Sequence, residues 1–257
     1  MTQWVRFRHQ DQTNFGTLDG AQIVVHSGDM FGVSKANGTR LALADVELLS
    51  PCVPTKVIAL WNNFHALAAK LNVAEPAEPL YLLKAPTTVT APNAVVQRPK
   101  AYDGKVAYEG ELAIVIGKRC SAVSVAEADA FIHGYTCVND ITASDILNRD
   151  PTFPQWARAK GFDDFCPFGP AVVTDIDPAT LTVRTILNGA ERQSYKISDM
   201  IFSAQELVSK ISHDMTLLPG DIIACGTSLG VGVMKEAVNS ITVAIDGVGE
   251  LTNEFRN

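Results

Sequence analysis

The segment Tyr108–Lys118, with the sequence YEGELAIVIGK, constrains this chain more than any other. Its apolar, β-branched run ends at Gly117, which is typical of a buried strand. Glu109 and Glu111 stand at the start of that strand, where residues two apart point to the same face. Neighbouring carboxylates repel each other unless a proton or a cation lies between them. On this segment alone, a metal site and a solvent-facing charged edge are equally good interpretations.

A third acid, Asp140, follows the predicted strand Tyr135–Val138. Binding and catalytic groups collect in loops after strands, although an Asn-Asp pair such as Asn139-Asp140 more often forms a turn. Three carboxylates without histidine partners favour a hard ion that prefers oxygen ligands. Glu109, Glu111 and Asp140 therefore predict a site for Mg²⁺ or Mn²⁺.

Three further positions carry candidate chemistry. Lys160 would have a lowered pKa near a metal and could then move protons, but in isolation a solvated loop lysine explains it better. The glycine-rich stretch Gly226–Gly232 follows a predicted strand, and its backbone amides could bind an anion or form a simple tight turn. His65 lies near a helix start, where a lone histidine is more often structural than catalytic. No GxSxG elbow, P-loop or dinucleotide fingerprint is present.

Bulk composition excludes several classes of partner. The 257-residue chain has a formal net charge of -7 and no basic cluster, which argues against nucleic acid. Its longest apolar runs are too short to span a bilayer, and its first residues lack a secretory signal pattern. The five cysteines are scattered and form no CxxC pair. We therefore expect a cytoplasmic protein with reduced thiols.

Strand patterns dominate the chain and helices are few, so the predicted class is α+β, mostly β. Residues 1–52 predict a small N-terminal β domain, because apolar and polar residues alternate between turns rich in Gly and Asn. Residues 53–257 are expected to form the second, catalytic domain. The segment Pro151–Pro170 is predicted to be a loop on the substrate side. Helices are predicted over residues 66–72, 124–130 and 203–212.

Six ordered stretches within residues 55–255 resemble the fumarylacetoacetate hydrolase superfamily: EPLYLLKAP (78–86), YEGELAIVIGK (108–118), GYTCVND (134–140), KGFDDFCPFGP (160–170), MTLLPGDIIACGT (215–227) and GVG (230–232). The resemblance implies a mixed β-sandwich roll of this type, usually assembled as a homodimer. It also implies that the Glu-x-Glu pair and the later Asp bind a divalent ion, which maps onto Glu109, Glu111 and Asp140. Lys160 maps onto an active-site lysine, and Thr227 of the Gly226-Thr227 turn maps onto a threonine that holds a substrate carboxylate.

Members of this superfamily act on 2-oxo acids and β-diketo acids through a metal-stabilised enolate. Its hydrolytic members carry an Asn-Tyr-x-x-His-x-x-Glu segment whose His–Glu pair activates water. Here Asn63 matches the asparagine and is a candidate for substrate binding. The histidine position, however, falls on Leu67 and the glutamate position on Lys70. His65 is two residues early, and the residue three positions further on is Ala68, which cannot orient it.

The missing pair favours enolate chemistry without water attack. The chain looks closest to the bacterial 2-hydroxyhepta-2,4-diene-1,7-dioate isomerase / 5-oxopent-3-ene-1,2,5-tricarboxylate decarboxylase branch. We predict a metal-dependent isomerase or decarboxylase of an enolisable 2-oxo dicarboxylic acid, as in aromatic catabolism. The alternative is a C–C hydrolase of acylpyruvates or fumarylacetoacetate-type acids, with His65 or Glu75 as replacement base. A degenerate binding protein that keeps the fold is the third hypothesis.

Overall fold

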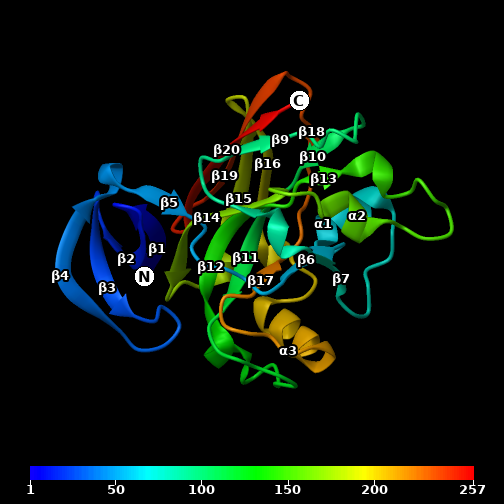
Figure 1. The fold of residues 1–257 in the computed structure, drawn as a ribbon. Coiled ribbons are helices and arrows are strands. Elements are labelled where there is room, and N and C mark those ends of the chain that lie inside the picture. Colours follow the sequence, from blue (N-terminus) through cyan, green and yellow to red (C-terminus); the bar gives the residue numbers. More distant parts are fainter.

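The computed structural model describes residues 1–257, in which strands predominate as predicted (Figure 1). The three α-helices are α1 (His65–Leu71), α2 (Trp156–Lys160) and α3 (Ala204–Asp214). The strands are β1 (Thr2–His9), β2 (Gln12–Asp19), β3 (Gln22–Gly28), β4 (Ser34–Ala42), β5 (Glu47–Leu49), β6 (Val57–Trp61), β7 (Leu80–Lys84), β8 (Val89–Thr90), β9 (Val95–Gln97), β10 (Val106–Tyr108), β11 (Gly110–Ile116), β12 (Ile132–Asn139), β13 (Thr142–Ala143), β14 (Cys166–Thr174), β15 (Thr182–Leu187), β16 (Ala190–Lys196), β17 (Ile222–Ala224), β18 (Gly232–Val233), β19 (Val238–Ile245) and β20 (Gly249–Arg256).

The N-terminal unit is an antiparallel meander of β1 to β4, and β5 pairs with the second half of β1. Its small core gathers the alternate apolar residues of β1 and β3, including Val5, Phe7 and Ile23. The unit does not end in a separate sheet, because β1 also pairs with β14 of the following region. It forms the blue lobe at one side of Figure 1.

The central layer of the region after the N-terminal unit is the strand series β14-β12-β11-β17-β6-β7, which continues the same large sheet. A second sheet of order β16-β15-β19-β20-β9 packs against it. Residues of β11, β15, β19 and α3 share the largest buried apolar cluster, which is why the two sheets enclose one core. Every residue of β11 is buried. The strand that carries Glu111 thus lies at the centre of the fold.

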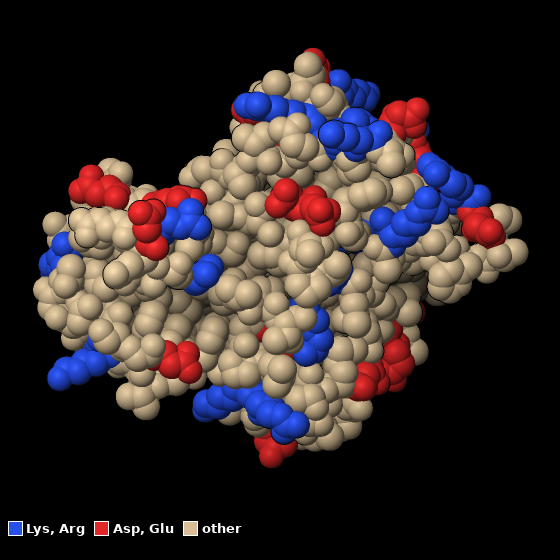
Figure 2. All heavy atoms as spheres, in the orientation of Figure 1, with Lys and Arg blue, Asp and Glu red and all other residues tan.

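Helix α3 begins as predicted. Ser203 and Glu206 form a capping box, in which the Ser203 side chain accepts the Glu206 N–H and the Glu206 carboxylate accepts the Ser203 N–H. The buried residues Leu207, Val208 and Ile211 recur at helical spacing and face the core. None of the helices is long and apolar enough to cross a membrane. On the face drawn in Figure 2, basic and acidic side chains are interspersed.

Two local predictions were wrong. No α-helix forms over 124–130: the regular turn is a 3₁₀-helix at Ala128–Phe131, although Ser124 and Glu127 do contact each other. Tertiary bonds override the capping pattern, because the backbone N–H and C=O of Val123 bond to two serine hydroxyls of α3. The segment Pro151–Pro170 is not all loop, since it contains α2 and the first residues of β14.

Candidate active site

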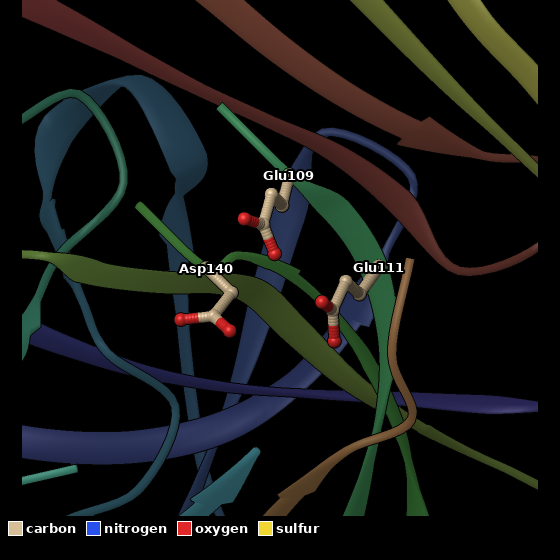
Figure 3. A group of neighbouring side chains, drawn as sticks. All are labelled: Glu109, Glu111 and Asp140. Carbon is tan, nitrogen blue, oxygen red and sulfur yellow. The ribbon is translucent and has the colours of Figure 1, made fainter. Parts of the chain in front are cut away.

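Three carboxylates meet where β11 and β12 lie side by side (Figure 3). Glu109 precedes β11, Glu111 is its second residue, and Asp140 directly follows β12. One ligand oxygen from each can be chosen so that all lie within 4.8 Å of one another. The strand register brings them together, because Gly110 pairs with Asn139 and the Asp140 N–H donates to the Glu109 carbonyl at 2.8 Å. The predicted metal-ligating residues therefore form one cluster.

Glu109 lies between β10 and β11, next to Gly110, whose backbone groups bond to side chains of the second sheet. The Gly110 N–H donates to Gln193 at 3.0 Å, and its carbonyl accepts the Tyr195 hydroxyl at 2.6 Å. Only glycine fits there, since an added Cβ would collide with the Thr185 hydroxyl. The predicted continuous strand from Tyr108 is thus split into β10 and β11, and the break is at the first ligand.

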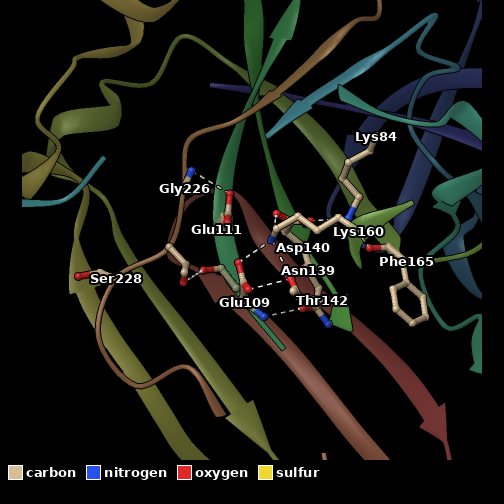
Figure 4. A network of polar contacts seen from close by, with 12 residues as sticks. Lys84, Glu109, Glu111, Asn139, Asp140, Thr142, Lys160, Phe165, Gly226 and Ser228 are labelled. Carbon is tan, nitrogen blue, oxygen red and sulfur yellow. Dashed lines mark hydrogen bonds and ion pairs between the residues drawn. The ribbon is translucent and has the colours of Figure 1, made fainter. Parts of the chain in front are cut away.

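Each carboxylate has one oxygen held by a donor from another part of the fold (Figure 4). The Gly226 N–H donates to Glu111 Oε2 at 2.8 Å. The Thr142 hydroxyl donates to Glu109 Oε1, also at 2.8 Å. Lys84 donates to Asp140 Oδ1 and, at 2.8 Å, to the carbonyl of Phe165. These donors fix the orientation of all three side chains.

The remaining oxygens have only one cationic partner between them. Lys160 Nζ lies 2.9 Å from Glu109 Oε2 and 2.5 Å from Asp140 Oδ2. Glu111 Oε1 is buried and has no hydrogen-bond partner. A buried carboxylate oxygen without a donor is costly, and its neighbours are hard oxygen ligands that Mg²⁺ or Mn²⁺ prefers. The residue set therefore fits a divalent ion.

The electrostatics of the cluster follow from burial and from the two lysines. Burial and the Asp140 charge raise the pKa of the Glu111 carboxyl well above its usual range. Burial also tends to raise the pKa of Asp140, but the adjacent Lys160 and Lys84 outweigh it and the net shift is downward. Burial tends to lower the pKa of Lys160, yet the charges of Asp140, Glu109 and Glu111 raise it overall. Without an ion, Lys160 is an ammonium bound by carboxylates. The lowered pKa expected for Lys160 near a metal stays a prediction.

Lys160 is not a solvated loop lysine. It is the last residue of α2, and its side chain is only 3% exposed. Its ammonium also donates to Thr142 Oγ1 at 2.7 Å, so all its close partners belong to the carboxylate cluster. The structure thus places Lys160 in the predicted site.

The three predicted substrate-binding residues line the turn behind Glu111. Gly226 uses its N–H to orient Glu111, and Thr227 Oγ1 donates to the Gly110 carbonyl at 3.1 Å. The Asn63 side chain donates to the Cys225 carbonyl at 2.8 Å and accepts the backbone N–H of Phe202 at 2.9 Å. These contacts hold the turn in place; direct substrate binding by these residues stays a prediction.

His65 has a carboxylate partner that the sequence spacing did not indicate. Its Nδ1 lies 2.5 Å from Glu75 Oε1, and the two side chains are 50% and 52% exposed. Glu75 can reach His65 because the chain reverses after α1 at Asn72, which has the left-handed conformation with φ 53°. The Asn62 side-chain amide also donates to the Ala74 carbonyl at 3.0 Å. A His–Glu pair is therefore present, formed across a loop rather than along one helix turn.

Lys84 was missed as a site residue. It appeared only within the LKAP stretch, yet its side chain is fully buried against Asp140. The available signal was a lysine ending an otherwise apolar strand, since lysine is rarely buried without a partner.

A cavity of about 420 Å³ lies beside strand β7, lined by Trp61, Pro79, Leu80, Tyr81, Leu82 and Trp156.

Comparisons with known proteins agree with the fold. Residues 56–256 match the family described as fumarylacetoacetate (FAA) hydrolase C-terminal, and residues 2–51 match an Rv2993c-like N-terminal family. The chain belongs to the fumarylacetoacetate hydrolase family, which confirms the resemblance predicted from the six sequence stretches.

Several individual proteins are similar to this chain in sequence or in structure. The chain is 42% identical to protein Rv2993c of Mycobacterium tuberculosis, over 96% of both chains. It is 36% identical to the oxaloacetate tautomerase YisK of Bacillus subtilis, over 92% of this chain and 84% of that one. The structure of a 2-hydroxyhepta-2,4-diene-1,7-dioate isomerase from Mycobacterium marinum superposes with a TM-score of 0.91 and 38% sequence identity. The match covers 100% of this chain and 98% of the isomerase chain. The structure of a maleylpyruvate hydrolase from Sphingobium, in complex with manganese(II) and pyruvate, superposes with a TM-score of 0.81 and 28% sequence identity. That match covers 100% of this chain and 99% of the hydrolase chain.

Proposed function

We propose that this protein is a divalent-metal-dependent enzyme that isomerises or decarboxylates an enolisable 2-oxo dicarboxylic acid. The observation that carries the proposal is the carboxylate cluster, in which one oxygen from each residue lies within 4.8 Å of the others and the buried Glu111 Oε1 has no donor. Relatives named as oxaloacetate tautomerase and as dienedioate isomerase support this reaction class. The manganese in the maleylpyruvate hydrolase structure supports the use of a divalent ion.

Glu109, Glu111 and Asp140 would hold Mg²⁺ or Mn²⁺ through the oxygens that face one another. When bound, the ion would polarise the carbonyl of a 2-oxo acid and stabilise the enolate formed from it. Lys84 and Lys160 offset the negative charge of the ligands, which lets three carboxylates stay close together in a buried site.

His65 is the residue that we assign to proton transfer. Glu75 lies against its Nδ1, which leaves Nε2 to exchange a proton with the substrate carbon. The pair is half exposed, as a group that must meet an incoming substrate should be. Positioned general acid–base groups contribute about 10²–10⁴-fold to rate. Asn63, Gly226 and Thr227 are proposed to support the substrate carboxylate from the turn behind Glu111.

A C–C hydrolase is the second candidate, and the His65–Glu75 contact is the observation that favours it. A histidine oriented by a carboxylate is the arrangement that activates water. The sequence disfavoured hydrolysis because it lacked a histidine–glutamate pair at the expected spacing. The contact between His65 and Glu75 removes part of that reason.

A substrate panel with Mg²⁺ separates the two candidates. Purified protein is given enolic oxaloacetate, a 2-hydroxymuconate-type diene and an acylpyruvate, and loss of enol, CO₂ release and acid product are followed separately. We expect enol loss or CO₂ release to exceed acid product. Turnover of the acylpyruvate as the fastest reaction would instead establish the hydrolase, and inactivity with every substrate would contradict both.

We also propose a homodimer. β7 is the outer strand of the large sheet and carries Leu80 and Leu83, which are 41% and 46% exposed. Exposed apolar residues on an open strand edge favour association with a second chain. Light scattering coupled to size exclusion tests this, and a mass near the 27.6 kDa of one chain would contradict it.

A further inference from the structure

Two lysines contact the same carboxylate in this site, and they contact it differently. Lys84 binds Asp140 Oδ1, and its second partner is the Phe165 carbonyl, which is not part of the carboxylate cluster. Lys160 binds Asp140 Oδ2 together with Glu109 Oε2. Lys84 therefore contacts one of the three carboxylates, whereas Lys160 joins two of them.

The position of Lys160 resembles that of a bound cation. Its ammonium lies between two of the three carboxylates, and Glu111 Oε1 is left without a hydrogen-bond partner. An ion bonded to Asp140 Oδ2 at about 2.1 Å would lie within roughly 4.6 Å of Nζ, because Nζ is 2.5 Å from that oxygen. Two cations so close repel each other in a buried site.

The two lysines also differ in how firmly they are held. Lys84 lies on β7, which is paired along its whole length with β6, and its side chain is fully buried. Lys160 ends the five-residue helix α2, whose N-terminus has no side-chain cap. A short helix without a cap can shift at lower cost than a paired strand.

We infer that Lys160 is the resident counter-cation of the metal-free site and competes with the divalent ion for Glu109 and Asp140. Lys84 is a positioning residue that stays on Asp140 whether or not an ion is bound. This inference rests on the metal site of the proposed function. It adds that metal affinity is set by an internal cation.

Mn²⁺ titration tests the competition without any assay of turnover. Calorimetry, and the electron paramagnetic resonance signal of free Mn²⁺, give the dissociation constant for wild type, Lys160→Met and Lys84→Met. We expect Lys160→Met to bind Mn²⁺ at least about fivefold more tightly than wild type, the lower end of typical couplings between sites. Lys84→Met removes the same charge from the same carboxylate, and we expect it to bind no more tightly than wild type.

Controls make the outcomes separable. Lys118→Met removes one charge from an exposed position and should leave the dissociation constant unchanged. Lys160→Gln repeats the test with a neutral polar side chain, and circular dichroism verifies the fold of each variant. Equal or weaker binding by both Lys160 variants overturns the inference but leaves the proposed function standing. Equal tightening by Lys84→Met also overturns it. Absence of Mn²⁺ and Mg²⁺ binding to wild type would refute the proposed function itself.

Discussion

Replacing Glu111 with Gln should stabilise the metal-free protein, although Glu111 is a predicted metal ligand. Glu111 is the only one of the three carboxylates without a contact to a lysine. Its Oε2 keeps the Gly226 N–H, which a glutamine oxygen can also accept. The new amide nitrogen would face Glu109 and Asp140 in place of a repelling charge, because the three residues are within 4.8 Å.

The size of the gain follows from the cost of a buried acceptor that lacks a donor, about 1–3 kcal/mol and more when it is charged. We therefore expect Glu111→Gln to gain about 1–3 kcal/mol in the free energy of unfolding. In a chain of this size each kcal/mol raises the melting temperature by about 2–4 °C. Glu109→Gln is the matched control with the opposite sign, since it removes a carboxylate that pairs with Lys160.

The gain in stability of Glu111→Gln over wild type should also increase as the pH rises. The pKa of Glu111 is raised in the folded protein, so its protonated form is the one that folding favours. The stability that this group contributes is present below the unfolded pKa, about 4.3, and is lost as pH rises through the folded value. The advantage of Glu111→Gln over wild type should therefore grow between pH 5 and pH 8.

Urea unfolding of both proteins with chelator, at pH 5 and pH 8, measures this directly. Added Mg²⁺ or Mn²⁺ should stabilise wild type and leave Glu111→Gln unchanged, because the variant lacks a ligand. The reasoning is refuted if Glu111→Gln is less stable than wild type at pH 8, or if its advantage shrinks as pH rises.

Three other substitutions test separate parts of the structure. His65→Ala should lower turnover by about 10²–10⁴-fold without changing Mn²⁺ affinity, and an unchanged rate would remove His65 from the mechanism. Asp221→Asn should cost about 3–5 kcal/mol in urea unfolding, because this buried carboxylate accepts bonds from Thr55, Lys56 and Leu218; a loss below about 1 kcal/mol would contradict that role. Ser203→Ala should cost about 1 kcal/mol by removing the cap of α3, measured by thermal melting, and a neutral effect would show that packing alone sets the helix start.

The metal ligands could be predicted from the sequence because the contacts among them are between neighbouring strands. Glu109 and Glu111 share one strand end, and Asp140 follows the strand that pairs with it. Alternation along a strand and the position of a residue after a strand are local properties that spacing reveals. The cap of α3 at Ser203 was predictable for the same reason.

The supporting residues could not be predicted because their contacts are remote in sequence. Lys84 is 56 positions from Asp140, and Gly226 is 115 positions from Glu111. Glu75 pairs with His65 only because the chain reverses after Asn72. Spacing along the chain carries no information about such pairs, which depend on the order of strands within the sheet.

The charge of the site connects the two lysines to the proposed substrate. When all three acids are ionised, as an ion requires of its ligands, Glu109, Glu111 and Asp140 count as three negative charges and Lys84 with Lys160 as two positive ones, which leaves one net negative charge. A divalent ion changes that balance to one net positive charge, so the loaded site attracts a carboxylate that the empty site repels. A 2-oxo dicarboxylic acid carries two carboxylates, and one of them would restore neutrality at the ligands. The second carboxylate needs a separate partner. A side chain outside the carboxylate cluster should therefore determine which dicarboxylic acid is accepted.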